Sequence, residues 1–190
     1  MGEDSLHGGV PEGYATVTPW IISADTARLL AFVADAFGGE ELGRLANPDG
    51  VIEHAEMRIG GAIVMAFDAR PGWPATPAFL RLFVPDADRA YERALAAGAT
   101  GVTDVTRLFF GDKVGRVRDP LSNLWWIQER AEIVDPVQQA YRAAEPRSAA
   151  AMAYVQESLD TEMKIRAWGG GRNSLTRPAW GEGSRRSVPA

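Results

Sequence analysis

The sequence contains no cysteine and only two histidines, and both shortages exclude whole classes of chemistry. Without cysteine the chain has no disulfide, no thiol nucleophile and no thiolate metal site. His7 lies in a glycine-rich N-terminal stretch, so His54 is the only histidine in the part expected to fold. A serine–histidine–aspartate site would need His54 beside a nucleophilic serine, but the sequence has no nucleophile-elbow motif.

Long apolar runs and an excess of positive charge are also lacking. No apolar run approaches the length that spans a bilayer, and residues 1–13 lack the basic and apolar regions of a signal peptide. The formal net charge is −5 and the isoelectric point is about 5.1, which gives no reason to expect nucleic acid as a partner. The sequence therefore predicts a cytoplasmic protein with no membrane partner.

With 46% hydrophobic residues, the chain can bury a sizeable core, and its composition changes along its length. Residues 1–13 read as a flexible N-terminal lead. Residues 14–131 read as one folded domain, and 132–168 as a helical extension. Residues 169–190 are rich in glycine, serine, proline and arginine, which predicts a disordered tail.

The domain reads as two similar halves, about 14–69 and 77–131. The patterns of the first half predict strands 16–22, 40–46, 51–59 and 62–68, and a helix that begins near Asp25 and stops at Gly38. The second half predicts strands 79–84, 101–110, 112–119 and 124–130, and a helix that Gly98 closes.

An internal repeat relates the halves. At an offset of 61, Asp25 matches Asp86 and Arg28 matches Arg89. A single βαβββ unit cannot bury both faces of its sheet, so two such units are expected to pair. The fold class is therefore α/β (α+β): two βαβββ modules forming a concave cleft, plus C-terminal helices.

Three stretches carry a family resemblance: 17–45, 48–68 and 109–129. The last is the most specific, because it places an Asp-Pro turn before an aromatic final strand. The domain resembles the vicinal-oxygen-chelate superfamily of glyoxalases, bleomycin-resistance proteins and extradiol dioxygenases, most closely its small glyoxalase-like branch. The resemblance implies that activity lies in the cleft between the halves.

The resemblance also implies where metal ligands would stand. Four strands of such enzymes each supply one ligand, and these positions fall at or near Thr18, Met65, Phe79 and Trp126. Methionine, phenylalanine and tryptophan are not useful ligands for a hard or borderline divalent ion, and one threonine is a poor one. The sequence therefore predicts no metal and no cofactor, and argues against glyoxalase I or dioxygenase activity.

Strand alternation indicates which side chains share a face with these positions. If Gly60 and Gly61 form a two-residue hairpin turn, residues whose numbers sum to 121 stand opposite each other. The predicted ligand-binding residues are Trp20, His54, Glu56, Met65, Phe67, Phe79, Arg81, Phe83, Trp126 and Gln128.

An apolar, aromatic face with few polar groups suits a small hydrophobic or aromatic ligand. The leading hypothesis is a metal-free binding protein of the sequestration or resistance type. One alternative is a metal-independent isomerase or epimerase using His54 and Glu56. Another is an interaction module that acts through its C-terminal helix. The structural alternative is that the aromatic residues are packed core and that Arg81 simply pairs with Glu56.

Two helices are predicted after the domain. Asp135 and Pro136 begin the first, 136–145, and Ser148 caps the second, which runs to residue 168. The second helix carries an apolar stripe made of Met152, Val155, Leu159 and Met163. The stripe must dock on its own domain, on a second subunit or over the cleft, and a homodimer is expected.

Overall fold

The computed structural model describes residues 9–11 and 13–170. Most of the predicted flexible lead (1–8 and 12) and of the predicted disordered tail (171–190) lies outside the described residues. The helices in the described part are too short or too polar to cross a membrane.

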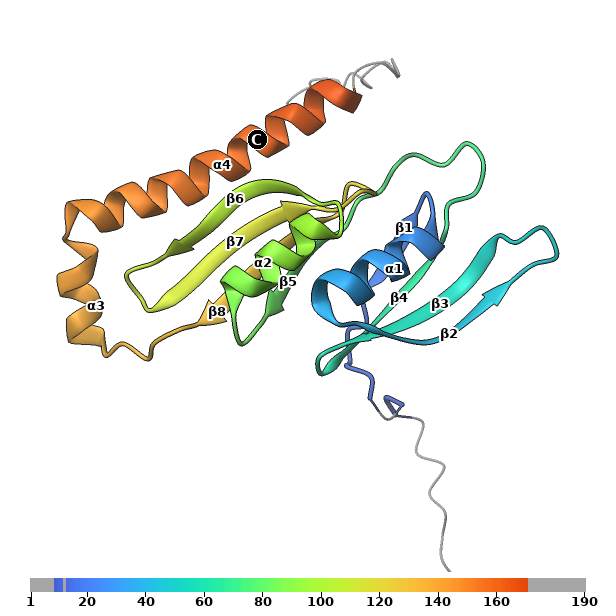
Figure 1. Ribbon diagram of the computed structural model, residues 1–190, viewed down its shortest axis with the longest axis horizontal. Helices are drawn as coiled ribbons and strands as arrows, with labels where there is room; N and C mark the ends of the chain where they lie inside the picture. Colours follow the sequence, from blue (N-terminus) through green and yellow to red (C-terminus); the bar gives the residue numbers. More distant parts are fainter. Residues whose placement is uncertain (1–8, 12, 171–190) are drawn as a thin grey trace, which may run out of the picture.

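The first half forms a four-stranded sheet and one helix (Figure 1). Its sheet order is β1-β4-β3-β2, with β1 parallel to β4 and the other pairs antiparallel. The elements are β1 (Trp20–Ser23), α1 (Thr26–Phe37), β2 (Glu40–Ala46), β3 (Ile52–Ile59) and β4 (Ala62–Asp68).

The second half repeats this arrangement with the sheet order β5-β8-β7-β6. Here β5 is parallel to β8, and the remaining pairs are antiparallel. The elements are β5 (Phe79–Phe83), α2 (Ala87–Ala96), β6 (Thr100–Arg107), β7 (Asp112–Arg118) and β8 (Leu124–Arg130). The predicted fold class of two βαβββ modules is confirmed.

The repeat extends to the helix caps. The Asp25 side chain accepts a hydrogen bond from the backbone N–H of Arg28, and Asp86 accepts the same bond from Arg89. Each carboxylate satisfies a donor that the first turn of a helix leaves free. The two aspartates that lie 61 residues apart in the sequence therefore make the same capping hydrogen bond in each half.

The last strand of each half supplies a second carboxylate to the same helix end. Asp68 accepts from the backbone N–H of Thr26, and Glu129, at the same offset, accepts from that of Ala87. Negative charge is stabilised at a helix N-terminus. These bonds hold each helix against the parallel strand pair of its own sheet.

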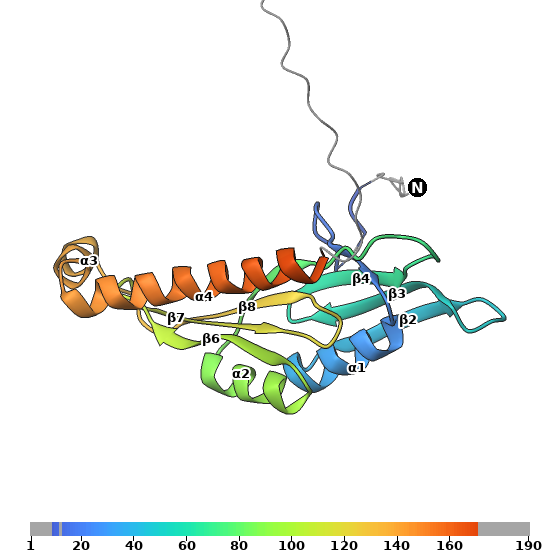
Figure 2. The ribbon, with the colours of Figure 1, turned by 90° about the horizontal axis from the view of Figure 1, so that it is seen from above.

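The core lies between the two helices and one face of both sheets. Figure 2 shows α1 and α2 on the same side of the sheets, and the two helices contact each other. Trp125 of the second half is fully buried and packs against Phe32 and Phe37 of the first, with ring centroids 6.4 and 5.1 Å apart. The halves therefore share one hydrophobic core.

The turn between β7 and β8 is built on Asp119, which is 3% exposed. One carboxylate oxygen accepts from the backbone N–H groups of Leu121 and Asn123, and the other from Asn123 Nδ2 and Trp125 Nε1. The Asn123 side-chain oxygen accepts from the N–H of Ala78, directly before β5. This turn therefore joins three strands.

Two strand ends differ from the predictions by more than one residue. The first strand begins at Trp20 rather than residue 16, after Pro19, which has no N–H to donate to a ladder. The second strand of the second half, β6, ends at Arg107 rather than Phe110, because Leu108 and Gly111 form the turn into β7.

Two helices follow the domain: α3 (Pro136–Ala143) and α4 (Pro146–Gly170). Asp135 caps α3 as predicted, accepting from the N–H groups of Val137 and Gln138. The prediction that Ser148 caps the second helix is wrong. That helix begins at Pro146, a residue suited to a first helical position, and Ser148 lies in its first turn.

The long helix α4 crosses the second sheet on the face opposite α2 (Figures 1 and 2). Val155 is buried there, whereas Met152 and Met163 are 39% and 40% exposed, so the predicted stripe docks only in part. Polar contacts complete the docking: Glu162, 4% exposed, accepts from Arg118 and Arg166.

We expect the Asp119→Ala variant to lower the free energy of unfolding by about 3–4 kcal/mol, because four buried donors lose their acceptor. Urea unfolding followed by circular dichroism measures this change. The control is Asp35→Ala at an exposed site on α1, where a change within about 0.5 kcal/mol is expected. Equal stability of the two variants would contradict the central role of this turn.

Candidate functional site

The residues predicted to bind a ligand alternate with core residues along their strands. Trp20 is 56% exposed, whereas the next residue, Ile21, is 1% exposed and packs in the core beneath α1. Glu56 stands opposite Met65 across the Gly60-Gly61 hairpin, as the sum of 121 predicts. The predicted strand registers are therefore present, and these side chains share the sheet face that α1 and α2 leave free.

In the first half, aromatic and titratable side chains form one group. The Trp20 ring meets His54 and Phe67 edge to face, with centroids 6.0 and 5.5 Å apart. His54 Nε2 lies 2.8 Å from one oxygen of Glu56, and the Tyr14 hydroxyl donates to the other at 2.6 Å. Glu56 therefore pairs with His54 and not with Arg81.

Tyr14 stabilises the ionised form of Glu56. Its hydrogen bond, followed by that of His54, lowers the pKa of the Glu56 carboxyl below the ordinary value. In return, the bond to Glu56 raises the pKa of the Tyr14 hydroxyl. Sequence reasoning missed Tyr14 because this residue precedes the first strand, where no alternation places a side chain.

In the second half, the ring of Trp126 is the centre of a cationic group. Phe79 stacks on it with centroids 6.2 Å apart, and the guanidinium carbons of Arg81 and Arg116 lie 4.4 and 4.0 Å from its centroid. Arg81 and Arg116 stand in register with Trp126 on the two strands that flank β8.

The helix α4 covers this second group and, with the sheet, forms an open pocket of about 470 Å³. Arg81, Arg116, Trp126 and Gln128 line it from the sheet. The side chains of α4 that line it are Met152, Val155, Gln156 and Leu159. The C-terminal helix therefore docks on its own domain, over the second sheet, which is one of the three places predicted for it.

Arg116 is the functional candidate that sequence reasoning missed. Its side chain is 2% exposed, and one of its terminal nitrogens donates to Thr103 Oγ1 and to the backbone carbonyl of Val155 in α4. Burial, with a smaller contribution from Arg81, lowers the pKa of Arg116 to about 10, so the group is a cation at neutral pH. Pairing the two strands on either side of the 119–123 turn would have placed Arg116 opposite Trp126.

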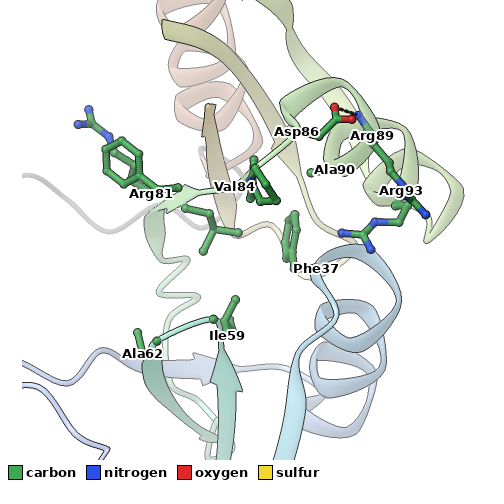
Figure 3. A pocket seen from close by; sticks show the side chains of 14 residues that line it. Phe37, Ile59, Ala62, Arg81, Val84, Asp86, Arg89, Ala90 and Arg93 are labelled. Atoms are coloured by element: carbon green, nitrogen blue, oxygen red, sulfur yellow. Dashed lines mark hydrogen bonds between the residues drawn. The ribbon is translucent and has the colours of Figure 1, made fainter. Parts of the chain in front are cut away.

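A second hollow, of about 640 Å³, lies where the two halves meet (Figure 3). Figure 3 shows Phe37 and Val84 at its centre, with Ile59 of the first half on one side and Arg93 of α2 on the other. Only Arg81 and Phe83 of the ten predicted residues line it. The structure therefore divides these ten residues between two sheets instead of gathering them around this hollow.

The family's metal position does not fit the residues present. Met65, Phe79 and Trp126 stand at three of the ligand positions and offer no useful oxygen or imidazole ligand. Elsewhere in the described part, three acidic side chains converge: Asp86, Asp88 and Glu129. Lys113 already lies there, with its amine 2.8 Å from Asp88 and 3.3 Å from Glu129.

Sequence comparison finds relatives in mycobacteria. An uncharacterised protein of Mycobacterium bovis is 37% identical over 120 residues, which cover 57% of this chain and 79% of that protein. An uncharacterised protein of Mycobacterium tuberculosis has the same identity over the same length, covering 71% of its own chain.

Structural comparison finds solved proteins that share the fold of this chain. The crystal structure of TioX from Micromonospora sp. ML1 has a TM-score of 0.53 and 27% identity, covering 61% of this chain and 98% of that one. Protein PA1353 from Pseudomonas aeruginosa has a TM-score of 0.54 at 20% identity, covering 62% of this chain and 99% of its own, and shares the fold.

A family model matches residues 14–127, which are more than half of the chain and extend from the start of the first half into β8, the last strand of the second. The chain therefore belongs to the Glyoxalase/Bleomycin resistance protein/Dioxygenase superfamily.

Proposed function

We propose that this protein binds a small hydrophobic or aromatic molecule on the sheet face opposite α1 and α2, without a metal. The cavity under α4 carries the proposal, because aromatic and aliphatic side chains line it together with charged and amide groups. Such a composition is typical of small-molecule sites. The ligand would be sequestered, as in proteins of the resistance type.

Exposed aromatic rings on this face support the same conclusion. Phe79 and Phe83 are 49% and 65% exposed, and Trp20 is 56% exposed on the neighbouring sheet. Exposed large apolar side chains that cluster mark surfaces that bind a partner or a ligand. Packed core is therefore the weaker interpretation for these rings.

The pairing of His54 with Glu56 favours a second candidate function, metal-independent acid–base catalysis. An ionised carboxylate 2.8 Å from an imidazole orients the ring, as a catalytic base requires. In this alternative the protein would be an isomerase or epimerase that moves a proton on its ligand.

We also propose that the protein is a cytoplasmic homodimer. The edge strand β2 is exposed along its whole length, and it carries Leu42 at 37% and Leu45 at 61% exposure. An unpaired sheet edge with apolar side chains is a ready surface for a second copy.

Binding is tested by tryptophan fluorescence during titration with 2-naphthol. The background is the double variant Trp168→Phe/Trp180→Phe, which removes one emitter from α4 and one from the predicted tail. We expect saturable quenching, with an affinity about threefold to tenfold lower in Trp126→Ala, since an edge-to-face aromatic contact contributes about 0.5–1.5 kcal/mol. Trp73→Ala, outside the cavity, is the matched control. Lack of saturable quenching by any planar aromatic would refute the proposal.

The catalytic alternative is tested by NMR in D₂O with compounds that bind. Proton abstraction would replace a C–H signal of the ligand with deuterium. We expect the His54→Ala variant to keep binding and to lose this exchange if His54 is the base. Exchange at an equal rate in His54→Ala would exclude that role.

The homodimer is tested by sedimentation velocity at about 20–50 μM. A species of twice the chain mass is expected, and Leu45→Glu in β2 should shift it toward monomer because it places charge on an apolar edge. Glu53→Gln on β3, also exposed, serves as the control. A monomer at these concentrations would end this proposal.

A further inference from the structure

The cavity under α4 contains more positive charge than its own acids neutralise. Arg81, Arg116 and Arg130 line it, and Asp112 is the single acid among its lining residues. Asp112 already accepts from Arg130 and from Gln128. Within the described part of the chain, neither Arg81 nor Arg116 has a carboxylate within 4 Å.

Burying a guanidinium without an anion costs free energy, and Arg116 is such a group. Buried charges in proteins are ordinarily paired or hydrogen-bonded at every donor. One terminal nitrogen of Arg116 is satisfied by Thr103 and by Val155 of α4, but Nε is buried without a partner.

Most of the buried polar atoms without a hydrogen-bond partner in the described residues belong to side chains that line this cavity. Five buried side-chain nitrogen and oxygen atoms in the described residues lack a hydrogen-bond partner, and three of them belong to residues that line it. Arg116 Nε and Trp126 Nε1 are donors, and Gln128 Oε1 is an acceptor. Such atoms require a water or ligand that supplies the complementary groups.

We propose that the cavity under α4 binds a planar organic anion, an aromatic carboxylate that also carries a hydroxyl group. The carboxylate accepts from Arg116 and Trp126 and lies near Arg81, while the hydroxyl donates to Gln128 Oε1. The rings of Trp126 and Phe83 and the aliphatic side chains of α4 contact the aromatic part. This inference rests on the proposed function, because it names the ligand class of the same site.

Isothermal titration calorimetry on the full chain compares three probes: 4-hydroxybenzoate, the neutral 4-hydroxybenzamide of the same shape, and neutral 2-naphthol. We expect the carboxylate to bind at least about tenfold more tightly than the amide, because charge-assisted hydrogen bonds are about twice as strong as neutral ones. In Arg81→Gln, at an exposed residue, this preference should fall toward parity. Arg28→Gln on α1 removes the same charge far from the cavity and should keep it.

Arg116→Gln should abolish the preference for the carboxylate over the amide. Because Arg116 is buried, this substitution can also disturb the fold, so a spectroscopic measurement on the protein with Arg116 in place is added. The indole N–H signal of Trp126, assigned with Trp126→Phe, should shift downfield when 4-hydroxybenzoate saturates the protein. No movement of this signal, or equal affinity for acid and amide, would overturn the inference. If the amide and 2-naphthol bind as well as the acid, only the anion is refuted. If none of the three binds, the proposed function fails with it.

Discussion

The buried carboxylate of Asp119, which pairs with no cation among the described residues, positions most of the second half. Four N–H donors satisfy Asp119, and together they fix the turn between β7 and β8. Because the turn sets the register, Trp125 enters the shared core and its neighbour Trp126 faces the other side, opposite Arg116. Asn123 then binds the chain before β5, which brings Arg81 beside Trp126. The cation–aromatic group of the candidate site follows from this one turn.

Most of the fold could be read from the sequence, because strand patterns, helix starts and glycine stops recur in both halves. The bounds of β2, β4 and β8 match those predicted. The repeated aspartates at 25 and 86 proved to be repeated helix caps. The errors lie where no alternation exists. Before Trp20 a proline ends the pattern, and around Ser148 two possible helix starts lie two residues apart.

The candidate site was only partly predictable, and the reason is the position of α4. Alternation placed ten side chains on the free faces of the sheets. It gave no sign that Arg116 is buried, since an arginine on a strand normally faces solvent. What buries Arg116 is a helix about 40 residues later, held by contacts such as Arg118 with Glu162. Tyr14 was missed for a related reason, because an irregular segment places it beside Glu56.

The two sides of the cavity under α4, the sheet and the helix, come from separate segments of the chain. The family model ends at residue 127, whereas α4 begins at Pro146. Substitutions in Met152, Gln156 or Leu159 can therefore reshape the cavity while the shared core between α1, α2 and the sheets stays as it is. The stability of the domain and the shape of this cavity can thus change independently. In this chain, a change in α4 alters the surface above the second sheet without altering the domain beneath it.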